Sequence, residues 1–142
     1  AAYESDIEAC GIITCDDLGF IVGFSPDGLV GEDGLIEVKS RVAKFQIQTV
    51  LSNEVPSEYM LQCQMGLMVS GRKWCDFIQF SNGMPLFVKR VFPDLDIQDT
   101  IREALVAFED VVHDMVIEYK AKTRGLPELK WVDHEWSDFD EL

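Results

Sequence analysis

Hydrophobic and polar positions along the chain predict short strands that alternate with helices. Five segments, in which apolar and polar residues mostly alternate between turn residues, are predicted strands: 12–15, 18–24, 35–40, 74–80 and 86–91. Four segments are predicted helices, the last of them strongly amphipathic: 1–9, 44–51, 58–69 and 97–119. The first three strands are expected to form an antiparallel meander.

Charged residues gather on two neighbouring strands within residues 25–40, which read SPDGLVGEDGLIEVKS. Glu37 and Lys39 alternate with apolar residues, so strand geometry points both charges out of one face while the apolar side chains turn into a core. The turn signal at 31–34 reverses the chain between the strands. Pairing across this turn is expected to bring Asp27 close to Glu37 and Lys39.

Two carboxylates and a lysine in this arrangement suit phosphate chemistry. Converging carboxylates form a hard oxygen site for Mg²⁺ or Mn²⁺. A neighbouring lysine can orient a water molecule or stabilise charge that develops on a phosphate. The same pattern also fits a cross-strand salt bridge on a solvated face, so the spacing alone leaves both interpretations open.

The predicted helix at 58–69 carries two glutamines, Gln62 and Gln64, among apolar residues. Buried amides must find hydrogen-bond partners, so a glutamine pair in this setting can indicate a functional site. The pattern leaves open the alternative that both glutamine side chains face solvent.

Composition and charge narrow the class of protein. The chain has 142 residues, enough for one globular domain, and a formal net charge of −14, which excludes a broadly basic nucleic-acid surface. No apolar run has the length of a membrane span, so no membrane role is expected. The four cysteines lack zinc-site spacing and are expected to be reduced, buried thiols. The chain does not begin with Met, which suggests a fragment.

Residues SPDG, the hairpin to IEVK, the helix YMLQCQMGLMVSG and the strand WCDFIQF together resemble the phage lambda exonuclease-like, YqaJ-type branch of the PD-(D/E)xK nucleases. The resemblance runs from about residue 11 to residue 91. It implies an α/β (α+β) fold, with a restriction-endonuclease-like core in which helices flank a central mixed β-sheet. We expect a nuclease core at 1–125, without its N-terminal helices, and an acidic, aromatic tail at 126–142.

The resemblance also implies roles for individual residues. Asp27 and Glu37 match the family's metal ligands, with the backbone carbonyl of Val38 as an additional oxygen. Lys39 matches the catalytic lysine, and Gln62 matches a glutamine placed beside that lysine and the attacking water. The implied DNA-binding residues are Ser25, Tyr59, Gln64, Arg41 and Lys44. A further acidic ligand of the family would fall before Ala1, and whether Glu4 or Glu8 replaces it stays open.

The implied activity is Mg²⁺-dependent exonuclease digestion of double-stranded DNA ends, 5′ to 3′, with release of 5′-mononucleotides. The resemblance implies a homotrimer that acts with a single-strand annealing protein in phage-type recombination, in the cytoplasm of a bacterial host. A structure-specific endonuclease and a non-catalytic nuclease-fold binding module are the alternatives. A ring would need basic residues only on its lining, for which the candidates are Arg41, Lys44, Arg72, Lys73, Lys89 and Arg90.

Overall fold

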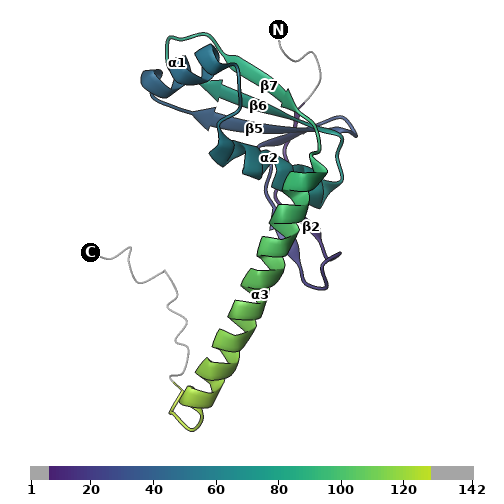
Figure 1. Cartoon of the computed structure of the whole chain (residues 1–142), viewed down its shortest axis with the longest axis vertical. Helices are drawn as coiled ribbons and strands as arrows, with labels where there is room; N and C mark the ends of the chain where they lie inside the picture. The colour runs from purple at the N-terminus through teal and green to yellow at the C-terminus, as the bar shows by residue number, and fades with distance from the viewer. Residues whose placement is uncertain (1–6, 129–142) are drawn as a thin grey trace, which may run out of the picture. The chain divides into compact units, whose positions relative to one another are not determined.

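A computed structural model describes residues 7–128 and shows a mixed sheet with helices (Figure 1). Its elements in chain order are β1 Ile7–Glu8, β2 Ile13–Cys15, β3 Val22–Phe24, β4 Gly28–Val30, β5 Gly34–Ser40, α1 Ala43–Ser52, α2 Ser57–Ser70, β6 Trp74–Phe80, β7 Phe87–Val91 and α3 Leu95–Thr123. Five strands form one sheet in the order β1-β4-β5-β6-β7. Because β5 and β6 run parallel and the other pairs antiparallel, the sheet is mixed, and the predicted α+β class is confirmed.

Two predictions for the N-terminal part were wrong. Ile7–Glu8 is a strand that pairs with β4, where the end of a helix was expected, and residues 1–6 lie outside the described residues. The strands β2 and β3 form a sheet of their own, so they do not continue into β5 as a meander. Strands of two or three residues contain too little alternation to be recognised from a period-2 pattern.

The strand β5 lies inside the sheet and has both faces covered. Leu35 and Glu37 are buried on the side of α2, whereas Ile36 packs on the opposite side with Val30 and Ile78. This alternation follows the two-residue repeat of a strand. The strand that carries the charged residues is therefore held rigidly from two sides.

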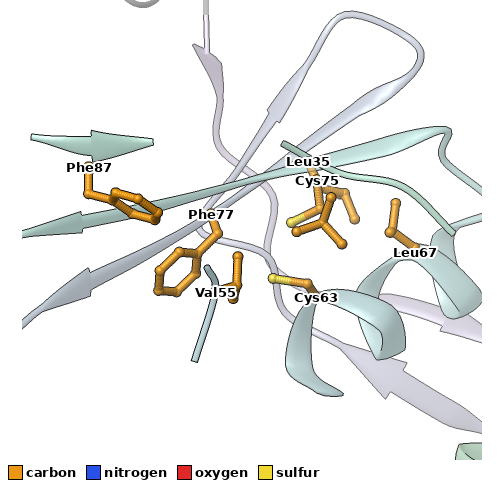
Figure 2. Packing of buried hydrophobic residues seen from close by; sticks show 8 residues of the cluster. Leu35, Val55, Cys63, Leu67, Cys75, Phe77 and Phe87 are labelled. Carbon is orange, nitrogen blue, oxygen red and sulfur yellow. The ribbon is translucent and has the colours of Figure 1, made fainter. Parts of the chain in front are cut away.

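An apolar core joins α2 to the sheet (Figure 2). Figure 2 shows Cys63 and Leu67 pointing from α2 toward Leu35 and Cys75 on the sheet. The four side chains are at most 2% exposed, so α2 is fixed against β5 and β6 by complete burial of its inner face. A hydrogen bond with Cys63 and burial both raise the pKa of the Cys75 thiol, so this thiol stays protonated.

Two details complete the packing of α2 and the cysteines. Gly66 allows close approach to Phe24, because a Cβ at this position would lie 2.6 Å from the Phe24 ring. All four cysteines are free, as predicted, but Cys10 and Cys15 are only half-buried. Cys10 lies in the connection between β1 and β2, and Cys15 ends β2, which pairs only with β3 and lies outside the five-stranded sheet.

Helix α1 is attached to the sheet by a buried amide pair. Gln46 donates hydrogen bonds to the carbonyl oxygens of Pro85 at 2.8 Å and Gln79 at 3.3 Å. Gln79 in turn donates to the Gln46 side-chain oxygen at 3.1 Å and to the carbonyl of Phe45 at 3.3 Å. Both amides are fully buried and mutually satisfied, so they fix the start of α1 against the end of β6.

The described chain divides into two compact units, with the boundary between Ala107 and Phe108 inside α3. The sheet, α1, α2 and the first turns of α3 belong to the first unit. In the second unit, α3 continues to Thr123 and Gly125 follows with a φ of 82°. Among the described helices, none combines the length and the hydropathy needed to cross a bilayer.

Candidate active site

Asp27 and Glu37 converge where β4 and β5 pair. Asp27 precedes Gly28, whose partner in β5 is Ile36. The Asp27 carboxylate oxygen Oδ2 accepts a hydrogen bond of 2.7 Å from the backbone N–H of Val38, the residue after Glu37. The local hairpin therefore places the two carboxylates as the turn pattern predicts.

Glu37 is the buried member of this pair, with a side chain only 2% exposed. One of its oxygens, Oε1, accepts a hydrogen bond from the Lys39 ammonium, whereas the other, Oε2, has no hydrogen-bond partner among residues 7–128. Burial raises the pKa of Glu37, and the contact with Lys39 offsets this only in part. An unpartnered buried carboxylate oxygen is unfavourable unless a ligand satisfies it, so the donor set fits a divalent cation held by Glu37 and Asp27.

The described residues supply two carboxylates to this site and no more. Within residues 7–128, no group of three or more His, Cys, Asp or Glu side chains is arranged to hold a metal ion. Glu8 lies in β1 with an exposed side chain, and Glu4 lies outside the described residues. The carbonyl of Val38 as a further oxygen ligand stays a prediction.

Lys39 and Arg41 share one aromatic neighbour, Tyr59 of α2. The Lys39 ammonium lies 5.4 Å and the Arg41 guanidinium 5.2 Å from the centre of the Tyr59 ring. Tyr59 itself stacks on Phe77 of the core at 5.5 Å, so its position is fixed from behind. This cation–π geometry favours both charges at the same ring and brings the predicted lysine and a predicted DNA-binding arginine into one site.

The two glutamines of α2 differ in their surroundings. Gln62 is half-buried one turn after Tyr59, and its amide makes no hydrogen bond within the described part of the chain. It can therefore offer both a donor and an acceptor to a ligand. Its place beside Lys39 stays a prediction.

Gln64 is instead buried and bonded on all sides. Its amide donates to the carbonyl of Phe92 at 2.8 Å and accepts from the N–H of Asp94 at 2.9 Å and from the Gln98 side chain at 3.2 Å. With a side chain 1% exposed, Gln64 ties α2 to the beginning of α3 and presents no polar atom to DNA. The predicted DNA contact of Gln64 gains no support from this geometry.

The remaining predicted DNA-binding residues lie at the surface. Ser25 is exposed and donates a hydrogen bond of 2.5 Å to the carbonyl of Gly11, which joins the end of β3 to the start of β2. Lys44 is exposed on α1, with its ammonium 5.9 Å from the Phe45 ring. Both can be reached by a large ligand.

Most of the basic residues predicted for a DNA-facing lining are engaged in contacts inside the protein. Arg72 donates to the carbonyls of Gly31 and Gly34, and Lys73 pairs with Asp33. The remaining pairs are Lys89 with Glu54, Arg90 with Asp76 and Arg41 with Glu58. Most of these basic side chains therefore already form ion pairs with carboxylates of the chain, where a DNA phosphate would otherwise bind.

Glu58 and Phe45 are site residues that sequence reasoning missed. Glu58 fits the pattern only as an acidic residue in the first turn of a helix. Its pairing with Arg41 depends on how α2 packs against β5, which no local pattern specifies. The available signal was the large excess of acidic over basic residues, which leaves few arginines without a carboxylate neighbour.

Comparison with known proteins gives one family and a well-matched structure. Residues 6–73 match the YqaJ-like viral recombinase domain. The structure is similar to that of an alkaline exonuclease (LHK-Exo) from Laribacter hongkongensis, with a TM-score of 0.78 and 30% sequence identity over 89% of this chain. A structure of LHK-Exo in complex with dAMP gives the same values. This chain covers 66% of the length of that protein. No curated protein matches the sequence.

The mixed sheet and its helices thus have the fold of a known nuclease. Residues 6–73 are similar to the YqaJ-like viral recombinase domain, and the described fold is similar to that of an alkaline exonuclease. The resemblance inferred from SPDG, IEVK and the glutamine helix is confirmed at the level of family and fold.

Proposed function

We propose that this chain forms the catalytic part of a metal-dependent DNA exonuclease. The observation that carries the proposal is the buried Glu37 oxygen without a partner, placed beside Asp27 and Lys39. The match of residues 6–73 to a viral recombinase domain and the structural similarity to an alkaline exonuclease support it.

The metal site consists of Asp27 and Glu37. A Mg²⁺ ion held there, or Mn²⁺ in its place, would supply the positive charge that stabilises a phosphate under attack. Asp27 is oriented for this task by the N–H of Val38, and Glu37 by its ion pair with Lys39. Both carboxylates are thus fixed before a ligand arrives.

Lys39 and Gln62 act on the phosphate and on the attacking water. The Lys39 side chain is 22% exposed and is positioned by Glu37 and the Tyr59 ring, so its ammonium can stabilise negative charge on the phosphate. The Gln62 amide, free of other hydrogen bonds among the described residues, can orient a water molecule. Ser25, Tyr59, Arg41 and Lys44 are the DNA contacts in this proposal.

The substrate in this proposal is a double-stranded DNA end. Digestion proceeds 5′ to 3′ and releases 5′-mononucleotides, in phage-type recombination beside a single-strand annealing protein. A homotrimeric ring in the cytoplasm of a bacterial host is part of the same proposal. The acidic surface of the chain then repels DNA from everywhere except the site.

The test is digestion of linear and of closed circular duplex DNA, with Mg²⁺ or with EDTA. The expected result is release of nucleotides from the linear duplex alone and only with Mg²⁺. Lys39→Ala should lower the rate by at least about a hundredfold, the scale for one group that stabilises transition-state charge. Lys122→Ala, a matched exposed lysine that pairs with Glu118 in α3, should leave the rate unchanged. Full activity of Lys39→Ala would refute the proposed site, and cleavage of the circle would indicate an endonuclease.

A further inference from the structure

Arg41 is held firmly at the edge of the site, while the carboxylate that pairs with it is not. The Arg41 backbone N–H donates to the carbonyl of Phe80 at 2.9 Å, and its guanidinium lies 4.4 Å from the centre of the Phe45 ring and 5.2 Å from that of Tyr59. Its side chain is 23% exposed, whereas that of its partner Glu58 is 61% exposed. Arg41 thus keeps its position through the two rings even when Glu58 turns away.

The ion pair borders an open pocket. Arg41 and Glu58 help to line a cavity of about 400 Å³, together with Phe45 and several hydroxyl side chains. Arg41 links this pocket to the proposed catalytic lysine, because Arg41 lines the pocket and the charged groups of Arg41 and Lys39 both lie near the Tyr59 ring. A nucleic-acid strand with one phosphate at Lys39 would bring a neighbouring phosphate close to Arg41.

We propose that Glu58 is a competing carboxylate: it occupies the face of Arg41 that a DNA phosphate must take, and it lowers the affinity of the site for DNA. The inference rests on the proposed function, since it assumes DNA as the substrate. It assigns Glu58 a role in DNA binding, because its carboxylate lies where the phosphate would bind to Arg41.

Two physical features make the competition effective and reversible. The hydrogen bond from Arg41 Nη1 to Glu58 Oε1 is 2.7 Å long, so the carboxylate blocks one of the donors that a phosphate would use. The pair is largely exposed on the Glu58 side, and ion pairs of this kind are weak because water screens them. A polyanion that also binds at Lys39 can therefore displace Glu58 from Arg41.

The test compares binding of a fluorescein-labelled duplex with a 5′-phosphate, in Ca²⁺ to prevent cleavage, for a set of charge-neutralising variants. Glu58→Gln is expected to bind about three- to tenfold more tightly, the range for removal of one exposed like charge beside a phosphate. The matched control is Glu54→Gln, which removes the same charge from the same pocket but from a residue that pairs with Lys89. Its affinity should change less than twofold.

A double-variant cycle then asks whether Glu58 acts through Arg41. In an Arg41→Met background, Glu58→Gln should no longer tighten binding, because the phosphate has lost its partner. Unchanged or weaker binding of Glu58→Gln would overturn the inference, as would a gain that persists without Arg41. Thermal unfolding of each variant confirms that it is folded. Absence of any duplex binding by the wild type would overturn the proposed function as well, so the two failures are distinguishable.

Discussion

Replacing Glu37 with glutamine should stabilise the metal-free protein and abolish its response to Mg²⁺. The wild-type carboxylate is buried, and its oxygen Oε2 lacks a hydrogen-bond partner among the described residues. Such a group costs about 1–3 kcal/mol of stability. The substitution removes this cost, but it also removes the ion pair with the partly exposed Lys39, which offsets up to about 1 kcal/mol of the gain in stability. The net gain for Glu37→Gln is therefore about 1 kcal/mol, or about 3 °C in Tm for a chain of this size.

With Mg²⁺ present, the wild type should become more stable than Glu37→Gln. At ten times its Kd, a ligand that binds only the folded state adds about 1.4 kcal/mol of stability. The wild type should gain about 4 °C in Tm from such a concentration of Mg²⁺. Glu37→Gln should gain almost nothing, because a neutral amide is a poor ligand for a hard cation. The measurement is thermal unfolding with Mg²⁺ or EDTA, with exposed Glu54→Gln as the control.

The pH dependence gives an independent check in EDTA. The pKa of Glu37 is raised above its ordinary value of 4.5, chiefly by burial, so the folded protein binds this proton more tightly than the unfolded chain does. The contribution of this group to stability therefore falls as the pH rises from about 4.5 through the raised pKa of the folded state. The advantage of Glu37→Gln should vanish at low pH and be complete above that range. A variant that is less stable than the wild type at pH 7.5 in EDTA would refute the reasoning, as would an equal response to Mg²⁺.

Three further substitutions test the support of the site. Gln64→Leu should lower the free energy of unfolding by about 2–4 kcal/mol in urea, because it orphans several buried polar groups, and Gln62→Leu is the matched change. Gly66→Ala should cost about 1–3 kcal/mol in the same assay, since its Cβ would overlap a buried phenylalanine ring. Arg90→Met should cost about 1–3 kcal/mol, because it leaves the buried Asp76 carboxylate without its two hydrogen bonds of 2.7 and 2.8 Å. An effect below 0.5 kcal/mol in any of the three would contradict the packing described here.

The parts of the site that could be predicted from the sequence are those set by neighbours along the chain. Asp27 and Glu37 come together through one turn and a strand register, both of which have local signals. The partners of Gln64 are near the beginning of α3, and no pattern around Gln64 specifies them. The pairing of Arg41 with Glu58 was out of reach for the same reason. Interactions between distant segments depend on packing, which a single sequence does not state.

The parallel pairing of β5 with β6 also bears on the order in which the protein folds. The hairpin β4–β5 contains Glu37, has Asp27 directly before its first strand, and closes over a short loop, so its entropic barrier is small. The β5–β6 contact must wait until both α1 and α2 have been placed across the sheet. Such non-local contacts form slowly, and the packing of α2 on the sheet brings Tyr59 to Lys39. The two carboxylates of the proposed metal site should thus meet early, and the protein should complete the proposed active site only in the last steps of folding.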